Sequence, residues 1–547
     1  MLRWVRGLCL LVCLCVPSLA GAQAALMPDA LQQFFDANGN PLASGTLTFY
    51  TAGTTTPQAV PVPPTAVSLP KTSPVQAAPP ADLVIPPAPP LTPEQALKTF
   101  KLPPGFRIEI VAADPLIETP IAMQWDADGR LWVVEMPSYM NTPTAEGELN
   151  PINRVSVLED TDGDGRMDKK TVFLDKLVMP RALCLAYGGV LVCEPPVLNF
   201  YPIEPGLKPG KPVLVDKNYA PNGIKNPEHT GNSPTWLMNN WIVSANHTLR
   251  FRRVDNEWKR SATTSRGQWG LTMDDWGRPY YNSNSDQLRT DYVPSEYYFR
   301  NPLFRTTAGL MQQPMKDQTV YPARVNPGVN RGYQEKTLKP DGRLDKYTAT
   351  CGPGIYRGDQ FPAEFLGNAF IPEPSANMVR RMVLTEKNGE LTGTNPYKEA
   401  EFLTSTDELF RPVNAYTGPD GCLYLVDMYH GILQHRVFLT SYLRKQAEDR
   451  GLDKVIKHGR IYRIVHDGKK PGPKPQLAAA APGLRPRPPV AARLDQPAVD
   501  RRGAGQPADS RAGRVRSPDR RGGAGSAVRA RRRRADRRAR PRAAVRA

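Results

Sequence analysis

A repeated pattern of apolar strands preceded by tight turns runs through the middle of the chain. In each copy a turn of the Asp/Asn-Gly type comes before a short run of apolar or aromatic residues. Such turns join antiparallel strands into hairpins, and the apolar run after the turn is expected to be buried. The six copies are Trp125–Val134, Leu185–Cys193, Trp236–Val243, Met273–Tyr281, Phe365–Ile371 and Thr417–Val426.

The spacing of these copies predicts the fold. It suits four-stranded blades joined by loops of variable length. We therefore predict an all-β fold, a six-bladed β-propeller over residues 93–467. The alternative is a β-sandwich with repeated hairpins, which we disfavour because the strands continue too far for one sandwich. The anchor residues Trp132, Leu191, Trp241, Tyr280, Phe370 and Tyr424 lie 59, 50, 39, 90 and 54 residues apart.

Two short segments of different character come before the repeats. Residues 25–54 alternate apolar and polar positions around Asn-Gly and Ser-Gly turns, which predicts a small hairpin similar to a phage-tail module. Residues 55–92 are dominated by Pro, Ala, Val and Thr. This composition favours extended polyproline conformations, so we predict a semi-rigid linker there.

The first residues predict an export signal. Arg3 and Arg6 precede an apolar run from Leu8 to Val16, and small residues follow up to Ala24. This order is typical of a signal peptide, here residues 1–24, and implies a periplasmic or secreted protein. A retained anchor is the alternative, although the apolar run is too short to span a bilayer.

Charge gathers at the other end of the chain. Residues 477–547 hold 20 Arg, 5 Asp and no Lys or Glu, so they supply +15 of the formal net charge of +18. With no aromatic residue and no periodicity, residues 468–547 are predicted to be disordered. Such a composition also results from GC-rich DNA read in a shifted frame, an origin that we favour over a nucleic-acid-binding arm. The nearly neutral body predicts no specific nucleic-acid partner.

Four cysteines follow the predicted signal, and their spacing fits neither a zinc site nor a haem attachment motif. Cys184 and Cys193 could pair across adjacent strands in an oxidising compartment, or remain buried thiols.

One acidic loop has the pattern of a calcium site. Asp160, Asp162, Asp164 and Asp168 alternate with other residues around Gly165, which permits a sharp turn. Ca²⁺ prefers six to eight oxygen ligands, and this loop offers most of them. Position twelve is Thr171 instead of the Glu of a helix-loop-helix hand, so we expect a loop between two strands. A solvated acidic turn without metal is the alternative.

Four segments together resemble a known family of enzymes, the soluble glucose/sorbosone dehydrogenase propellers, and in particular their bacterial branch called membrane-bound dehydrogenases. The resemblance covers about residues 98 to 467. The matching segments are Phe106–Ala112, Pro120–Val133, Tyr356–Phe370 and Arg411–Tyr424.

The resemblance implies a mechanism and a set of site residues. In that family a histidine takes the hydroxyl proton while hydride passes to pyrroloquinoline quinone, which is held with Ca²⁺ over the central channel. By motif match the histidine is His229, and Arg266 and Arg411 would hold the quinone's carboxylates and developing oxyanion. The family has Asn and Pro where this chain has Gly267 and Gln268, a departure that concerns quinone binding more than the fold.

Two functions remain open at this point. The first is an exported quinone-dependent sugar or alcohol dehydrogenase, which passes electrons to a quinone or a cytochrome. The second is a calcium-stabilised propeller that binds glycans or proteins without chemistry, because this type of fold hosts many functions. His430, His435 and the polar segment Tyr281–Gln287 could also line the channel, but structural roles explain them at least as well.

Overall fold

The computed structural model describes residues 84–299, 308–325 and 336–473, together with 49–50, 57–58 and 477. The predicted signal peptide, most of the linker and nearly all of the basic tail therefore lie outside the described residues. Within the predicted hairpin segment and linker, β1 (Phe49–Tyr50) pairs antiparallel with β2 (Pro57–Gln58).

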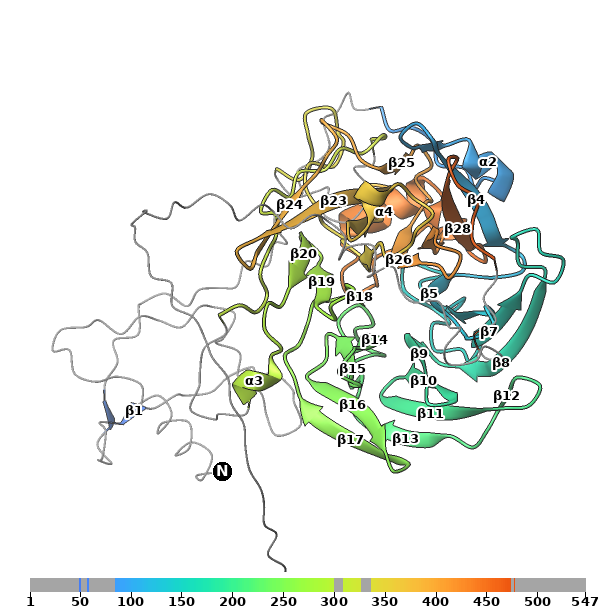
Figure 1. Ribbon diagram of the computed structural model, residues 1–547. Helices are drawn as coiled ribbons and strands as arrows, with labels where there is room; N and C mark the ends of the chain where they lie inside the picture. The colour runs from blue at the N-terminus through green and yellow to red at the C-terminus, as the bar shows by residue number, and fades with distance from the viewer. Residues whose placement is uncertain are drawn as a thin grey trace, which may run out of the picture. The chain divides into compact units, whose positions relative to one another are not determined.

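Six antiparallel sheets surround a central channel, and the predicted six-bladed propeller is confirmed (Figure 1). The first three blades follow one another along the chain. Blade 1 holds β5 (Pro120–Trp125), β6 (Leu131–Glu135), β7 (Asn153–Glu159) and β8 (Lys169–Leu177); blade 2 holds β9 (Ala182–Ala186), β10 (Gly189–Glu194), β11 (Val197–Glu204), β12 (Lys208–Pro209) and β13 (Val213–Asp216); blade 3 holds β14 (Asn232–Trp236), β15 (Ile242–Ala245), β16 (Leu249–Val254) and β17 (Glu257–Ala262).

The last three blades are less regular, and two of them take a strand from the beginning of the domain. Blade 4 holds β18 (Leu271–Met273), β19 (Pro279–Ser283) and β20 (Asp286–Thr290); blade 5 holds β21 (Gly354–Ile355), β22 (Ala369–Glu373), β23 (Met378–Lys387), β24 (Glu390–Thr394), β25 (Leu403–Ser405) and β3 (Phe100–Lys101); blade 6 holds β26 (Pro412–Thr417), β27 (Leu423–Asp427), β28 (Arg460–His466) and β4 (Phe106–Ala113).

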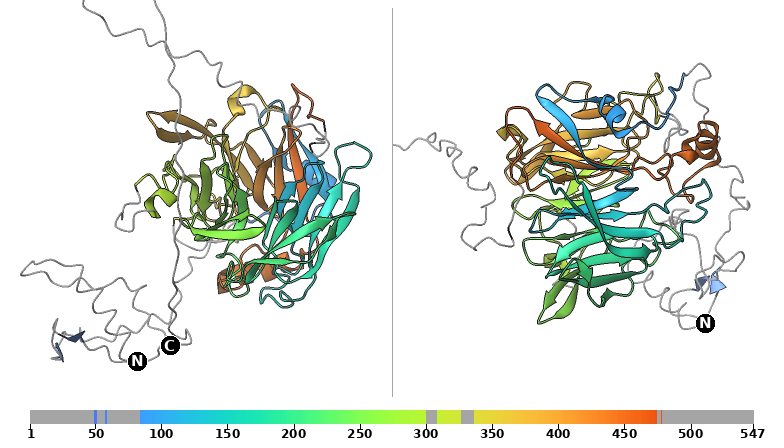
Figure 2. Two further views of the ribbon diagram at one scale, coloured as in Figure 1. Left: turned by 60° about the horizontal axis from the view of Figure 1, so that its bottom comes forward. Right: turned by 90° about the vertical axis from the view of Figure 1, so that its right-hand side faces the viewer.

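Short helices lie between the strands and before them. They are α2 (Pro93–Leu97), α3 (Glu296–Phe299), α4 (Ser441–Asp449) and the 3₁₀ turns η2 (Ala363–Phe365) and η3 (Leu452–Lys454). Helix α4 belongs to the long connection between β27 and β28, and it stands out from one face of the propeller (Figure 2, right).

The ring is closed by strands that are far apart in sequence. Strand β4 pairs antiparallel with β28, with Ala113 opposite Arg460 and Phe106 opposite His466. Residues just before the predicted boundary at 93 also contact the propeller, because the Leu91 amide donates to the Tyr429 hydroxyl at 2.8 Å. The folded domain therefore includes part of the segment that its composition assigned to the linker.

Each repeat found in the sequence is the hairpin between the first two strands of one blade. In three of the six repeats an Asp stabilises the turn, because it accepts hydrogen bonds from backbone amides of the turn and from the polar atom of the anchor side chain. These pairs are Trp132 Nε1 to Asp126 (3.0 Å), Tyr280 hydroxyl to Asp274 (3.1 Å) and Tyr424 hydroxyl to Asp420 (2.9 Å). A large anchor ring can thus be buried with its polar atom satisfied.

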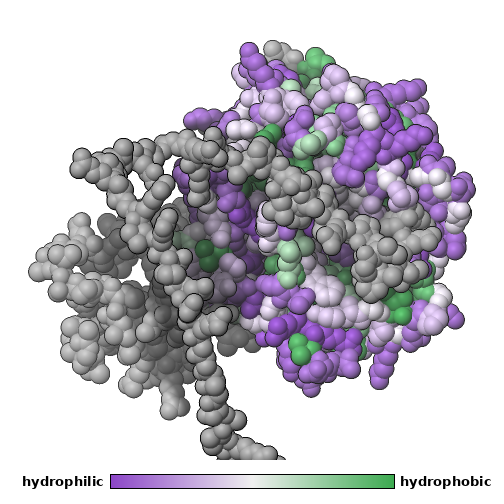
Figure 3. Space-filling model, in the orientation of Figure 1, coloured by the Kyte–Doolittle hydropathy of each residue, from purple (hydrophilic) through white to green (hydrophobic). Residues whose placement is uncertain are grey.

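Hydrophilic residues predominate on the face shown in Figure 3, with hydrophobic ones scattered between them. Within the described residues, no helix is long and apolar enough to cross a membrane.

All four cysteines that follow the predicted signal are free, so of the two alternatives for Cys184 and Cys193 the structure has the buried thiols. Burial raises the pKa of each of these two thiols to about 12.

Candidate functional site

The propeller topology brings the starts of all six first strands to one end of the channel. These strands, β5, β9, β14, β18, β21 and β26, contact one another around the ring. The first strand of every blade runs in the same direction along the channel, so the residues just before these strands meet at one end of it, the channel mouth. The connections between the second and third strands of each blade reach the same end, because neighbouring strands are antiparallel.

A cavity of about 510 Å³ lies at this mouth. That volume is typical of a site for a small molecule. Every blade contributes to its wall, and the connection that carries α4 covers one side. Polar lining residues include Tyr139, Arg181, Glu228, His229, Gln268, Trp269, Asn284 and Thr350, and apolar ones include Ile121, Met136, Val413, Met428 and Phe438.

His229, the predicted base, lines this cavity and is exposed. It lies in the loop before β14, and its Nε2 is 3.2 Å from the side-chain nitrogen of Gln268. Its ring packs at 5.1 Å from the ring of Phe438, which belongs to the covering connection. The geometry therefore gives His229 access to a molecule in the cavity, whereas its catalytic role stays a prediction.

Glu228, next to His229, is a half-buried carboxyl group in the same wall. It accepts a hydrogen bond from the backbone amide of His435 at 2.5 Å. Burial raises its pKa to about 7, although the His435 amide and the charge of Arg181 oppose the shift. A carboxyl group that titrates near neutral pH can exchange protons with a substrate, so Glu228 is a second candidate for acid–base work.

The raised pKa of Glu228 makes a prediction about stability. In the unfolded chain the Glu228 carboxyl group loses its proton near pH 4.5, whereas in the folded protein it keeps the proton up to about pH 7. The contribution of protonated Glu228 to the free energy of unfolding is therefore complete below pH 4.5, and it is lost as the pH rises to about 7. We expect Glu228→Gln to melt like the unsubstituted chain at pH 4.5 and to be more stable by about 1–2 kcal/mol at pH 8. A melting difference that is the same at both pH values, measured by calorimetry, would contradict the assignment.

Arg181 lies immediately before β9 and also lines the cavity, although it is only 2% exposed. Its guanidinium carbon is 5.6 Å from the ring centroid of Trp269, another lining residue. Burial lowers the pKa of Arg181. Among the described residues, it is the single Arg or Lys in the cavity wall.

Arg266, predicted to hold the quinone, is buried away from this cavity. Its Nε donates to Asp291 at 2.8 Å, and its other nitrogens donate to Thr263, Thr264 and Ser295. Four of the five N–H donors of this guanidinium are therefore engaged, one of them by a carboxylate. In the part of the chain that the structure describes, it is not among the lining residues.

The departure from the family motif beside Arg266 has a steric reason. Gly267 has a φ of +59°, and a Cβ there would lie 2.4 Å from the carbonyl oxygen of Asn282. Only glycine fits that backbone and that space. The Asn of the family motif could not be accommodated at this position without moving β19.

Arg411, the other predicted cofactor ligand, is 1% exposed and likewise does not line the cavity among the described residues. Its Nη1 donates to the carbonyl of Pro374 at 3.0 Å, and its Nε donates to that of His430 at 3.4 Å. The structure therefore does not bring Arg266 and Arg411 together with His229. The interactions that it shows for both arginines are internal to the fold.

Of the other polar candidates, two histidines are buried inside the fold and one asparagine lines the cavity. His430 is buried against the carbonyl of Tyr139, at 2.7 Å, and burial lowers its pKa to about 4. His435 is buried and its Nε2 lies 2.9 Å from Glu148. From the polar segment Tyr281–Gln287, Asn284 alone is in the cavity wall, as far as the described residues show.

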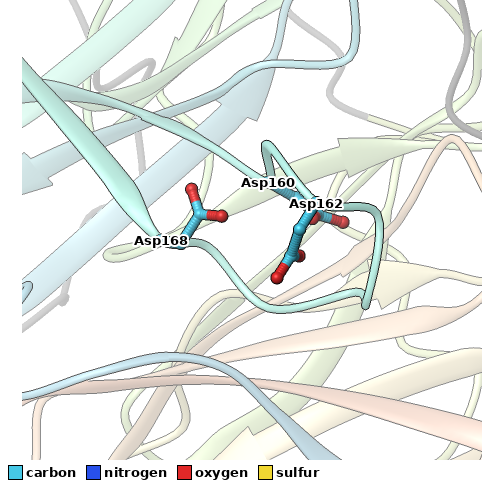
Figure 4. Close-up of side chains that lie close together, drawn as sticks. All are labelled: Asp160, Asp162 and Asp168. Atoms are coloured by element: carbon cyan, nitrogen blue, oxygen red, sulfur yellow. The ribbon is translucent and has the colours of Figure 1, made fainter.

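The acidic loop is the hairpin turn between β7 and β8, as the sequence predicted, and it is separate from the cavity. Oxygens of Asp160, Asp162 and Asp168 lie within 4.8 Å of one another, and the three side chains gather at the turn (Figure 4). Oxygens that bind one Ca²⁺ at about 2.3–2.6 Å lie at most about 5 Å apart, so this cluster fits the ion. Asp164 is not part of the cluster; it accepts from the backbone amide of Arg166 instead.

Calcium is expected to raise the melting temperature of the chain. Like charges at the three clustered carboxylates repel one another unless a cation neutralises them. Melting curves measured with a chelator and with millimolar Ca²⁺ test this, and Asp162→Asn combined with Asp168→Asn should abolish the shift. Identical melting of the unsubstituted chain in both conditions would refute a stabilising site.

Comparison with known proteins places the chain in a family. The model of a family described as "Domain of unknown function (DUF7133)" matches residues 92–468. The chain belongs to this family. The match begins and ends with the propeller, so DUF7133 here corresponds to the six blades. No curated protein matches the sequence.

Several solved structures are similar to the DUF7133 chain at low identity. The soluble aldose sugar dehydrogenase of Escherichia coli is 10% identical with a TM-score of 0.34, and the match covers 66% of this chain and 99% of that one. Virginiamycin B lyase of Staphylococcus aureus is 11% identical with a TM-score of 0.31 and covers 66% and 99%. A carbohydrate-active enzyme of family AA12 from Trichoderma reesei is 10% identical with a TM-score of 0.38 and covers 67% and 98%. These names describe different chemistries, so the activity is argued from the chain's own residues.

Sequence reasoning found His229 but missed Arg181 and Glu228. A positional rule would have found them, because His229 lies shortly before the first strand of its repeat. Applied to every repeat, the same rule points to Arg181 before β9, to Gln268 before β18 and to Thr350 before β21. These residues lie together because the six repeats form one ring.

Proposed function

We propose that this chain is an exported dehydrogenase of sugars or alcohols whose substrate binds in the cavity at the channel mouth. The observation that carries the proposal is the placement of His229, which faces this cavity beside Glu228 and Gln268. Oxidation of an alcohol releases a proton and a hydride. His229 accepts the hydroxyl proton once the substrate hydroxyl displaces the Gln268 amide nitrogen from Nε2. The hydride passes to an external two-electron acceptor, a quinone or the dye of the assay.

The other parts of the wall support a small polar substrate. Asn284 and Thr350 come from neighbouring blades and are joined by a hydrogen bond of 3.0 Å from the Thr350 hydroxyl to the Asn284 carbonyl. Because this bond uses the backbone carbonyl of Asn284, the side-chain amide of Asn284 is available to hydroxyl groups of a substrate. Apolar residues such as Met428 and Phe438 also line the cavity.

Pyrroloquinoline quinone fits the described residues poorly. It carries three carboxylates, and among the described lining residues only Arg181 offers a permanent positive charge. Arg266 and Arg411, which the resemblance assigned to hold it, are engaged inside the fold. We therefore derive no step through this quinone, and the calcium that we propose on the β7–β8 turn has a structural role.

Dye-linked oxidation of a panel of sugars and alcohols tests the proposal. The full chain is assayed with Ca²⁺, with and without added pyrroloquinoline quinone. We expect dye reduction with at least one member of the panel. The second candidate, a binding propeller without chemistry, is favoured by the burial of Arg266 and Arg411. Binding of a sugar without dye reduction under any of these conditions would establish it instead.

A further inference from the structure

Arg181 is a buried charge without a partner in the described part of the chain. It is 2% exposed, and its Nε and Nη1 atoms are buried and make no hydrogen bond. A guanidinium group cannot lose its charge in a protein, so it cannot avoid the cost of burial by becoming neutral. Leaving such a donor unpaired is unfavourable, which is why buried charges are almost always paired.

The carboxyl group of Glu228 does not supply the missing partner. Glu228 attracts Arg181 electrostatically, but the two form no ion pair. One oxygen of Glu228 is held by the backbone amide of His435. With a pKa of about 7, Glu228 is largely neutral in mildly acidic solution, so it neutralises Arg181 only in part.

The surroundings of Arg181 form a built site for an anion. The side chain lies in the wall of the cavity, with the face of Trp269 beside it at 5.6 Å. An aromatic face holds a guanidinium in position without using its donors. The positive charge of Arg181 therefore remains for an anion in the cavity. A carboxylate pairs with a guanidinium through charge-assisted hydrogen bonds.

We propose that Arg181 binds the carboxylate of an acidic small molecule in the cavity, and that the preferred substrate is a sugar acid instead of a neutral sugar. This inference rests on the proposed function for the location of the substrate. One guanidinium balances one carboxylate, whereas a phosphate dianion would bring a second negative charge that no other Arg or Lys among the described lining residues balances.

Binding of two matched sugars to the full chain tests the inference. D-Glucuronate and D-glucose differ in a carboxylate at one carbon, and calorimetric titration at pH 6 keeps Glu228 mostly neutral. We expect D-glucuronate to bind at least about tenfold more tightly, since hydrogen bonds to charged groups are the stronger ones. Equal affinities, or no measurable binding of D-glucuronate, would overturn the proposal.

Substitutions show whether Arg181 is responsible. Arg181→Met should remove the preference, and it should still fold because an apolar side chain of similar length replaces an unpaired charge. Arg181→Lys keeps the charge without the forked geometry, and should retain only part of the preference. Arg436→Met is the matched control, because Arg436 is exposed in the connection that covers the cavity but does not line it. An unchanged preference in Arg181→Met and Arg181→Lys would also overturn the proposal.

A second titration separates the two sources of a carboxylate. Pyrroloquinoline quinone is titrated into the unsubstituted chain and Arg181→Met. Weakened quinone binding with unchanged D-glucuronate binding would assign Arg181 to a cofactor and overturn the substrate assignment. Because calorimetry needs no turnover, Arg181-dependent binding of D-glucuronate without any dye reduction would support this inference while refuting the proposed dehydrogenase.

Discussion

Replacing His229 with Gln is expected to lower the rate of substrate oxidation about a hundredfold or more. Gln keeps the approximate size and hydrogen-bonding capacity of the side chain but has no titratable nitrogen. His229 is exposed in the cavity wall, so the change should leave the melting temperature nearly unchanged. Steady-state kinetics in the dye-linked assay measures the rate, and the loss should lie in kcat.

A second histidine provides the matched control for this substitution. His435 is buried and contacts Glu148 at 2.9 Å, and it does not line the described cavity wall. His435→Gln is therefore expected to lower the melting temperature while the folded fraction keeps most of its activity. Full activity with a lowered melting temperature in His229→Gln would show that His229 has the structural role instead.

Removal of the first two strands of the domain is expected to abolish folding. A chain of residues 114–547 lacks β3 and β4, which complete blades 5 and 6. Without β4, strand β28 becomes an open edge, and the buried side chains of Ile461 and Ile464 lose neighbours in the same sheet. Each large apolar side chain returned to water costs about 1.5–3 kcal/mol, and a domain is stable by only about 5–15 kcal/mol in total.

A slightly longer chain separates ring closure from a general effect of truncation. Residues 84–547 retain both closing strands and the contact of Leu91 with Tyr429. This chain should melt cooperatively like the full-length protein, as measured by circular dichroism. A cooperative transition at the same temperature in the 114–547 chain would show that the closing strands contribute little.

Local features of the fold could be predicted from the sequence because their physical causes are local. The Asp126 turn, the apolar run after it and the Trp132 anchor lie within seven residues, and one hydrogen bond joins the first to the last. The same turn chemistry recurs at Asp274 and Asp420. Six repeats of a turn followed by an apolar strand, at suitable spacing, were enough to predict six blades.

The boundaries of the domain were harder to predict because they depend on distant partners. Nothing in the composition of residues 84–92 marks them as part of the folded domain, yet Arg324 donates to the carbonyl of Pro86 at 2.8 Å. Blade 4 is also shorter than predicted, with three named strands in the described residues. The stretch after β20 is linked to its neighbours by isolated bridges such as that between Thr290 and Gln312.

The sequence by itself determined the hairpins, the number of blades, the turn that gathers Asp160, Asp162 and Asp168, and the histidine that precedes the third repeat. Tertiary structure decided which charged groups face the cavity. Arg266 matched a family motif, but Asp291 engages it inside the fold, whereas Arg181 matched no motif and lies unpaired in the wall. The physical reason is that a motif records residue types along the chain, while the cost of a buried charge depends on partners that only the closed ring of blades brings within reach.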